Sequence, residues 1–412
     1  MEYSLSDNQP AEKPRGEARR TAAVVLAGFC AFLDLYAPQP MLPELARHFG
    51  RTPGQVSQLV SISTIAVAIA APFAGALSDR WGRKRLIVAS ALLLAVPVML
   101  AATASGFGQL LFWRFFVGIL TPGVFALTVT YINEEWQERA GQAMAAYVSG
   151  TVLGGFAGRM LAAIVAEHAS WQLAFLILGV LNALGGAAIW LWLPREKHRA
   201  PATRGVARAM LLHLKNPRLL ATYAAGFCVL FSLLGVFTYV NFHLAAAPFR
   251  LGTAALGNIF VVYLAGALFT PLAGKWIDRL GQRKAFALAM LLALAGVLVT
   301  LIPSLVAVIA GLAIFCTGIF IGQSSASSFI GRAAKGAKAA AVGLYVSFYY
   351  LGGTFGAAVP GLFWRRFGWT GCVALMACAQ LVTAAIALRF WRIPANESAA
   401  ALPSVAVASA AE

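Results

Sequence analysis

Residues 75–85 read Gly75-Ala-Leu-Ser-Asp79-Arg80-Trp-Gly82-Arg83-Lys84-Arg85, a short charged loop between two long apolar stretches. The same pattern returns 199 residues later as Gly274-Lys-Trp-Ile-Asp278-Arg279-Leu-Gly281-Gln-Arg283-Lys284. A second pair of segments, beginning at Tyr147 and Tyr345, shares Tyr-Val-Ser and Leu-Gly-Gly at an offset of 198. Two matches at nearly the same offset predict that the chain consists of two related halves.

The composition indicates that both halves lie in a membrane. Of the 412 residues, 60% are hydrophobic and 11% are charged, whereas soluble domains are about 45–50% apolar. Because a membrane-spanning helix needs about 20 apolar residues, the sequence predicts an all-α membrane protein with twelve spans. These are residues 21–41, 56–76, 86–105, 108–131, 141–166, 171–193, 218–244, 254–274, 285–302, 305–330, 339–362 and 370–391.

The predicted spans divide the chain into five parts. Two six-helix halves, 21–193 and 218–391, are joined by a linker, 194–217, and flanked by tails, 1–20 and 392–412. Residues 194–216 carry six Lys or Arg residues and two prolines, so we expect the linker to be solvated.

The net charge of +17 would suggest a nucleic-acid partner in a soluble protein, but the positions of the basic residues argue against one. Of the 32 Lys and Arg residues, 25 fall on one side of the predicted spans, five fall on the other, and two lie inside spans. By the positive-inside rule, both termini and the linker are then cytoplasmic. We therefore expect a multi-pass protein of a bacterial inner membrane, with the lipid bilayer and no nucleic acid as its partner.

The chain lacks the residue patterns of common enzymes and metal sites. Its five cysteines lie in apolar stretches without metal-ligand spacing. It contains no His-Glu-x-x-His, Gly-x-Ser-x-Gly or Walker pattern. We predict neither enzymatic activity nor a cofactor or metal. Two parallel six-helix repeats are typical of transporters, in which a site between the halves opens alternately to each side.

The stretch 75–85 resembles the loop between the second and third helices of the major facilitator superfamily, whose pattern is G-x-L-x-D-R-x-G-R-K. Residues 111–118, which contain Arg114, resemble the fourth-helix motif of this superfamily, and the resemblance covers roughly residues 21–391. The chain looks most like the twelve-span drug:proton antiporters, in particular their acriflavine-sensitivity branch. The resemblance implies the superfamily fold and a monomer that couples the transport of a small molecule to the movement of a proton. Those antiporters have a Gly-Pro pair where this chain has Gly158-Arg159, which leaves the direction of transport open.

The residues of the charged loop suit a gate at the cytoplasmic face. Glycine permits a tight turn, and Asp79 can accept hydrogen bonds from backbone donors. The resemblance implies that Asp79 meets the start of the eleventh span and that Arg83 reaches an acid at the end of the fourth, where Glu134 and Glu135 lie. The alternative is that these charges only set the topology. The predicted gating residues are Gly75, Asp79, Arg80, Gly82, Arg83, Lys84, Asp278, Arg279 and Gly281.

Three charged residues, Asp34, Arg114 and Arg159, lie inside predicted spans at a similar depth. A carboxylate at this depth costs several kcal/mol unless it is paired, hydrated or protonated, so Asp34 is the predicted proton carrier and Arg114 its partner. The resemblance agrees, since it associates the fourth-helix Arg with proton coupling. A permanent Asp34–Arg114 structural pair is the alternative. Arg159 is predicted either to donate to helix-end carbonyls or to bind an anionic substrate.

Polar and aromatic residues in the spans expected to line a central cavity are the candidate substrate contacts. An apolar pocket with few polar groups suits lipophilic compounds, so the leading hypothesis is proton-coupled efflux of lipophilic or drug-like molecules. The alternative is proton-coupled or facilitated uptake of a small organic anion, which the two buried arginines favour. The predicted substrate-binding residues are Tyr36, Gln39, Arg159, Tyr239, Asn241, Gln323, Tyr345 and Tyr349.

Overall fold

The computed structural model describes residues 14–136, 139–196, 206–334 and 338–391, and these are helical apart from short connections. The first half contains α1 (Pro14–Leu33), η1 (Gln39–Met41), α2 (Leu42–His48), α3 (Pro53–Val56), α4 (Gln58–Trp81), α5 (Arg83–Ala101), α6 (Phe107–Glu135), α7 (Ala140–His168) and α8 (Trp171–Trp192). After α9 (Val206–His213), the second half contains α10 (Pro217–Ala245), α11 (Thr253–Ile259), α12 (Val262–Leu280), α13 (Gln282–Val299), α14 (Leu305–Ala333), α15 (Lys338–Ala358) and α16 (Pro360–Phe390).

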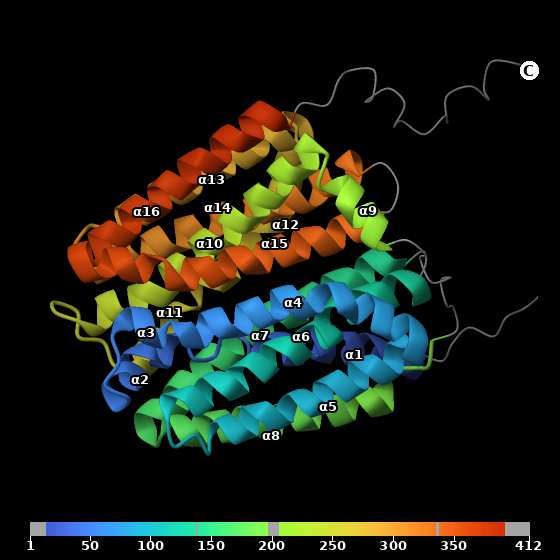
Figure 1. Ribbon diagram of the computed structural model, residues 1–412, viewed down its shortest axis with the longest axis horizontal. Coiled ribbons are helices and arrows are strands. Elements are labelled where there is room, and N and C mark those ends of the chain that lie inside the picture. The colour runs from blue at the N-terminus through green and yellow to red at the C-terminus, as the bar shows by residue number, and fades with distance from the viewer. Residues whose placement is uncertain (1–13, 137–138, 197–205, 335–337, 392–412) are drawn as a thin grey trace, which may run out of the picture.

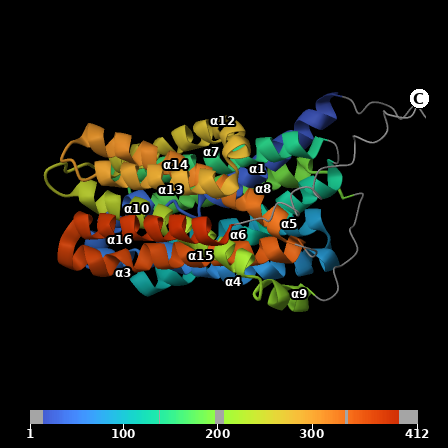
Figure 2. The same ribbon diagram turned by 90° about the horizontal axis from the view of Figure 1, so that it is seen from above.

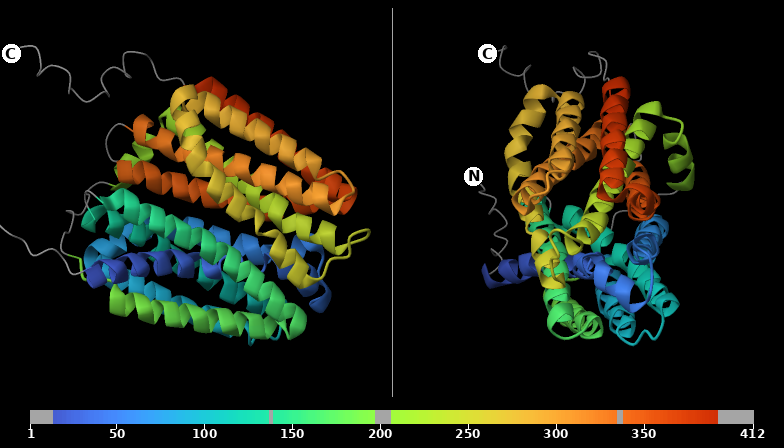
Figure 3. Two further views of the ribbon diagram at one scale, coloured as in Figure 1. Left: turned by 180° about the vertical axis from the view of Figure 1, so that it is seen from behind. Right: turned by 90° about the vertical axis from the view of Figure 1, so that its left-hand side faces the viewer.

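The helices form two elongated bundles that lie side by side (Figure 1), and the views from behind and along the helices show the same two bundles (Figure 3). One bundle holds α1 to α8 and the other holds α10 to α16. The start of α1, the end of α16 and α9 lie at one end of the molecule, here called the tail end (Figures 1 and 2). The opposite end, which holds α2, α3 and α11, is called the distal end.

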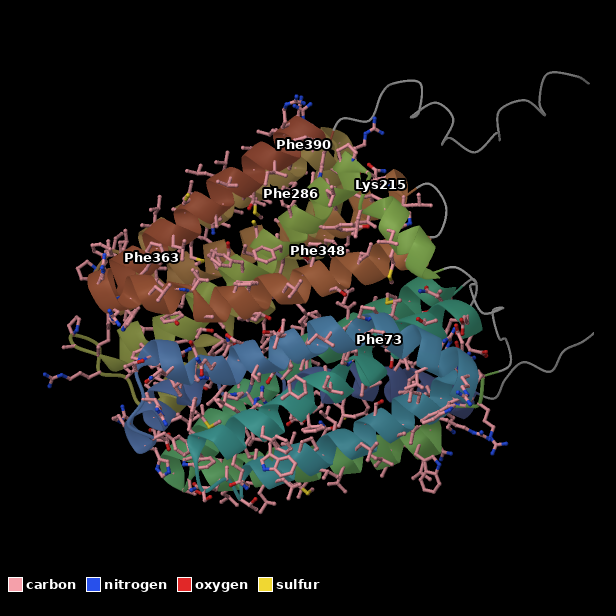
Figure 4. All side chains as sticks on the ribbon, in the orientation of Figure 1. Phe73, Lys215, Phe286, Phe348, Phe363 and Phe390 are labelled. Carbon is pink, nitrogen blue, oxygen red and sulfur yellow. The ribbon has the colours of Figure 1, made fainter. Side chains whose placement is uncertain are left out.

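The described part of the chain contains nine helical segments that are long and apolar enough to cross a membrane. They correspond to nine of the twelve predicted spans. The other three predicted spans, 21–41, 254–274 and 339–362, coincide with α1 and η1, with α11 and α12, and with α15. Apolar side chains such as Phe73, which is 68% exposed, cover the outer surface of the bundles, as expected of helices that face lipid. The segment α16 is interrupted at Gly368, where φ is 58° and ψ is −142°, and Figure 4 shows Phe363 before this interruption and Phe390 at the far end of the segment.

The internal repeat is a repeat of contacts as well as of sequence. A Cβ atom added to Gly154 or Gly158 on α7 would lie 2.2 or 1.8 Å from the backbone oxygen of Phe29 or Leu33 on α1. A Cβ atom added to Gly352 or Gly356 on α15 would lie 1.9 or 2.3 Å from the backbone oxygen of Phe227 or Phe231 on α10. All four pairs are related by the offset of 198, so glycine lets the same two helices meet backbone to backbone in each half.

The charged loop and its copy also share a conformation. Gly82 ends α4 with φ 96° and ψ 145°, and Gly281 ends α12 with φ 75° and ψ 147°. These positive φ values strain any residue with a Cβ, which is why both loops need glycine at this place. The turn lets the next helix, α5 or α13, begin one residue later.

The two bundles meet along α4 and α15 and at the distal end, and the surface between the bundles is here called the seam. Hydrogen bonds across this seam join Gln39 to Thr238 at 3.2 Å, Ser57 to Tyr239 at 3.1 Å and Thr64 to Thr354 at 3.1 Å. Near the distal end, α3 also packs against α16 and α11 packs against α7. These hydrogen bonds and helix contacts close the distal end of the molecule.

The structure departs from the predicted elements in several places, one of which is the division of the predicted span 254–274 into α11 and α12. The first predicted span, 21–41, is not one continuous helix, because α1 ends at Leu33 and the chain turns before η1 begins at Gln39. Pro38 and Pro40 lie in this stretch and cannot donate the backbone hydrogen bonds of a helix interior. The predicted linker contains the helix α9, which packs on α15. Residues 197–205 of the linker, residues 1–13 and the tail 392–412 lie outside the described residues.

Candidate functional site

Arg114 on α6 binds the backbone at the place where α1 ends. Its Nη1 donates to the carbonyl of Asp34 at 2.9 Å, its Nη2 donates to the carbonyl of Leu35, and its Nε donates to the carbonyl of Leu59 at 3.4 Å. The last carbonyls of a helix have no partner within the helix, and a cation is favourable near a helix C-terminus. Arg114 therefore stabilises the break in α1 through the backbone.

The carboxylate of Asp34 points to α8 rather than to Arg114. Asn182 on α8 donates from Nδ2 to Oδ2 of Asp34 and also to the carbonyl of Cys30 at 3.3 Å. Among the described residues, Asp34 forms no ion pair. The two side chains therefore form no salt bridge in this conformation, where the guanidinium of Arg114 is bound to backbone carbonyls, and the alternative of a permanent structural pair stays a prediction.

Arg159 on α7 lies in the seam between the bundles, with 3% of its surface exposed. Its Nε donates to Oε1 of Gln39 at 2.8 Å, and its Nη1 donates to the carbonyl of Gly155 at 2.6 Å. Three aromatic rings surround the guanidinium, those of Tyr36 in the first half and of Phe260 and Tyr263 in the second, with centroids 4.8–4.9 Å from Cζ. Cation–π attraction of this kind stabilises a desolvated guanidinium.

Among the residues that the structure describes, no acid neutralises Arg159. Within the described part of the chain, it has no carboxylate partner and its Nη2 has no hydrogen-bond acceptor. The buried hydroxyl of Tyr263 beside it also lacks a partner. The seam thus presents one positive charge and unused donors inside an aromatic enclosure formed by both halves.

The structure brings some of the predicted substrate contacts together and separates others. Tyr36, Gln39 and Arg159 form one cluster, and the ring of Tyr349 lies beside those of Tyr345 and Tyr350, with centroids 6.0 and 5.6 Å apart. The Tyr345 hydroxyl donates to Gln323 at 2.8 Å. Tyr239 is instead tied into the distal closure.

Two of the predicted contacts have local roles in this conformation. The Tyr239 hydroxyl donates to the carbonyl of Ala357 at 3.0 Å and pairs with Ser57 across the seam. Asn241 is buried, and its Nδ2 donates to the carbonyl of Phe237 on the same helix, α10, at 2.6 Å.

Sequence reasoning missed the second-half rings and the partner of Asp34. Phe260 and Tyr263 stand where α11 gives way to α12, and two aromatic residues at this spacing in an interrupted span were a usable signal. Tyr350, whose ring lies 5.7 Å from that of Phe125 across the seam, follows directly after a predicted contact. Asn182 was detectable as an amide side chain in the middle of an apolar span.

Comparison with known proteins identifies the family. The sequence profile of the Major Facilitator Superfamily matches residues 24–260 and 241–409. This chain belongs to the major facilitator superfamily. It is 35% identical over 353 residues to an uncharacterized transporter of Buchnera aphidicola subsp. Schizaphis graminum, which is 85% of this chain and 86% of that protein. It is 32% identical over 378 residues to the inner membrane transport protein YnfM of Escherichia coli (strain K12), which is 91% of each chain.

Solved structures share the fold. A bacterial homologue of the human lysosomal transporter Spinster, in an inward-facing and occupied conformation, has a TM-score of 0.76 at 14% identity, covering 94% of this chain and 99% of that one. The nucleoside transporter NupG has a TM-score of 0.73 at 15% identity, covering 90% of this chain and all of that one. This superfamily chain is therefore a multi-pass membrane transporter of a small molecule and not an enzyme.

The charged loop of this superfamily member forms a compact ionic cluster at the tail end. Arg83 lies 2.7 Å from Asp79 and donates to both carboxylate oxygens of Glu134 at 3.1 and 3.0 Å. Arg83 also donates to the hydroxyl of Ser78. The predicted contact of Arg83 with an acid at the end of the fourth span is present, and its partner is Glu134. Glu135 instead lies 3.9 Å from Arg20.

The remaining members of the predicted gating set contribute less to this cluster. Arg80 and Gly75 are exposed, and the backbone amide of Lys84 donates to Glu196 at 3.3 Å. In the second copy Arg279 is exposed, while the side chain of Asp278 lies outside the described part of the chain. The predicted contact of Asp79 with the start of α15 stays a prediction.

Two carboxylates of the first half bind the second half at the distal end. Glu167 accepts a hydrogen bond from the backbone amide of Ala254 at 2.7 Å, and Glu44 accepts one from the hydroxyl of Thr253 at 3.2 Å. A cavity of about 310 Å³ lies at this junction and is lined in part by Glu44, Arg47 and Glu167. Burial raises the pKa of Glu44, and this effect outweighs the hydrogen bond from Thr253.

Proposed function

We propose that this protein is a proton-coupled transporter of a small organic anion across a bacterial inner membrane, acting as a monomer by alternating access. The observation that carries the proposal is the uncompensated guanidinium of Arg159 in the seam between the halves. A buried charge is costly unless it is paired. An anionic group of the substrate would complete the pairing that the described residues leave open.

The surroundings of Arg159 favour an anion with an apolar or aromatic body. The rings of Tyr36, Phe260 and Tyr263 cover the guanidinium, so a ligand reaches its free donors through an aromatic enclosure. A lipophilic cation would meet a like charge there, which is unfavourable in a medium of low polarity. Because the rings come from both halves, binding is coupled to the relative position of the halves, as alternating access requires.

Asp34 is the proposed proton carrier. It is the acid that lies deepest in a predicted span, and its side chain is 1% exposed. Asp34 and the residues that contact Arg159, Tyr36 and Gln39, belong to one short segment after α1. Movement of a proton together with a monovalent anion transfers no net charge, which suits a site that holds a single unpaired cation.

The closed end is proposed to face the periplasm. The tail end holds α9, Lys215 and the described ends of the chain (Figures 1 and 4), and the positive-inside rule assigns an end rich in basic residues to the cytoplasm. The distal closure through Tyr239, Glu44 and Glu167 then corresponds to an inward-facing state. The loop around Arg83 is proposed to act as the cytoplasmic gate when the halves rock.

Efflux of uncharged lipophilic compounds is the second candidate function. It is supported by the aromatic rings of Tyr345, Tyr349 and Tyr350, which form a continuous series that reaches Phe125 across the seam. Such a wall gives affinity for apolar molecules without the need for a charge. Arg159 would then have the structural role of a donor to Gly155 and Gln39.

Transport by purified protein in proteoliposomes tests both candidates. Uptake of a panel of aromatic and aliphatic carboxylates and of lipophilic dyes is measured under pH gradients of each sign, which also determines direction. Arg159→Gln removes the charge, and Arg139→Gln, which affects an exposed pair with Glu17, is the matched control. Charge-assisted hydrogen bonds contribute about 1.5–3 kcal/mol, so anion affinity should fall by about 10- to 150-fold in Arg159→Gln only. Anion transport that is equal in both variants would refute the proposal.

A further inference from the structure

The contact between Asp34 and Asn182 leaves two oxygens unpaired. Oδ2 of Asp34 accepts a hydrogen bond from Nδ2 of Asn182, but Oδ1 of Asp34 and Oδ1 of Asn182 have no partner although both atoms are buried. The side chains are 1% and 0% exposed. Two acceptors without a donor, one on each side of the same contact, need a physical explanation.

Reversing the amide of Asn182 does not remove the problem. Its Nδ2 also donates to the carbonyl of Cys30 at 3.3 Å, and a carbonyl can only accept. A reversed amide would place its oxygen against the carboxylate and against this carbonyl, and three acceptors would then face one another. The orientation with Nδ2 toward Asp34 is therefore the one that satisfies the neighbouring backbone.

One proton on Asp34 satisfies both oxygens together. An ionised carboxylate is an acceptor only, whereas a carboxylic acid offers one donor and one acceptor, which matches the donor and acceptor of a primary amide. A hydroxyl at Oδ1 of Asp34 can donate to Oδ1 of Asn182 while Oδ2 keeps its bond from Nδ2. The acid and the amide then form a closed pair with two hydrogen bonds.

We propose that Asn182 is the positioning residue that holds the transported proton on Asp34 in this conformation. The inference rests on the proton coupling of the proposed function. The other described polar groups near the carboxylate do not supply a donor to Oδ1 of Asp34. Arg114 on α6 is bound to the carbonyls of Asp34 and Leu35, and Cys30 on α1 is a buried free cysteine. When the proton leaves, the acid–amide bond through Oδ1 is lost and the carboxylate becomes available to Arg114.

Infrared difference spectroscopy of the protein in lipid tests this pair directly. The carboxylic-acid C=O band that is present in the wild type and absent in Asp34→Asn belongs to Asp34. In Asn182→Leu this band should move to higher wavenumber, because the C=O group loses its N–H donor. The control is Gln380→Leu, which replaces another buried amide and should leave the band in place. An unmoved band in Asn182→Leu, or a wild type without this band at neutral pH, would overturn the proposal.

An exchange of the two side chains provides a second variant that keeps the packing volume. Asp34→Asn combined with Asn182→Asp puts the acid on α8 and the amide directly after α1, and its acid band should coincide with that of the wild type. A band at a clearly different position would show that the pair is not the unit that holds the proton. This outcome can be read even if Asn182→Leu does not fold.

These spectra do not depend on transport, so the two proposals can fail separately. If the acid–amide band behaves as expected but transport ignores an imposed pH gradient, the proton site stands and the proton coupling of the proposed function fails. If transport depends on the gradient and on Asp34 but the band does not respond to Asn182, the coupling stands and the role of Asn182 fails.

Discussion

Substitution of Gly158 by alanine should separate the two helices that build the Arg159 site. The added Cβ would lie 1.8 Å from the backbone oxygen of Leu33, whereas carbon and oxygen in contact are about 3.3 Å apart. Since the obstacle is backbone rather than a flexible side chain, α7 must move from α1 by about 1.5 Å. Forced overpacking of this kind costs about 1–3 kcal/mol, or about 2–4 °C in melting temperature for each kcal/mol in a unit the size of one half.

The change should also weaken anion binding. Arg159 follows Gly158, and its 2.8 Å bond to Gln39 cannot survive such a shift, so the guanidinium loses the contact that orients it. Gly141→Ala is the matched control on the same helix, because a Cβ there meets nothing within 4 Å and alanine favours a helix over glycine by up to about 1 kcal/mol. The two variants are compared by thermal unfolding in detergent and by anion binding. If Gly158→Ala and Gly141→Ala have the same melting temperature, the close approach of α1 and α7 does not limit stability.

Three further predictions concern other parts of the molecule. Arg83→Gln leaves the carboxylates of Asp79 and Glu134 without their shared cation and should lower the transport rate in proteoliposomes about tenfold. Substitution of the exposed Arg85 by Gln should not change the rate. Equal rates in the two variants would mean that the charges of this loop only set the membrane topology. Tyr263→Phe removes a buried, unpartnered hydroxyl, so it should raise thermal stability by about 1 kcal/mol while weakening anion binding, and unchanged binding would exclude this hydroxyl from the site. The raised pKa of Glu44 means that this carboxylate binds a proton more tightly when the distal end is closed, so closure should be most stable at low external pH and weaken as pH rises through this pKa. Spin labels at the exposed positions 51 and 250 should move apart with rising pH in the wild type but not in Glu44→Gln. The other charged neighbours of Glu44 are Arg47, His48 and Glu167.

The fold could be predicted well because its determinants are periodic and local. The apolar windows located the long helices, and the repeat offset of 198 reappeared as the spacing between equivalent glycine contacts. The break after Leu33 was not predicted, since the apolar composition continues through it. Pro38 and Pro40 did mark it, because proline and the residue before it disfavour a continuing helix.

The site was only partly predictable, because its other half comes from distant sequence. Tyr36, Gln39 and Arg159 could be chosen as polar, aromatic or charged residues inside the predicted spans, and they do meet. Which rings of the second half would cover Arg159 depends on how the bundles pack, and composition does not encode that. Depth also suggested that Asp34 would face Arg114, but rotation about the helix axis turns its carboxylate to Asn182.

The segment that joins Asp34 to Gln39 connects the proton site with the anion site, and this connection bears on how coupling could work. Arg114 holds the carbonyls of Asp34 and Leu35 at one end of the segment, and Arg159 holds Gln39 at the other. Because the stretch between them is a turn without the regular hydrogen bonds of a helix, a change at one end can reorient the other at a small cost. Loss of the proton from Asp34 would free its carboxylate to compete with these carbonyls for Arg114. We infer that the turn would then shift Tyr36 and Gln39 relative to the guanidinium of Arg159. Proton binding at Asp34 and anion binding at Arg159 would thus affect each other without direct contact.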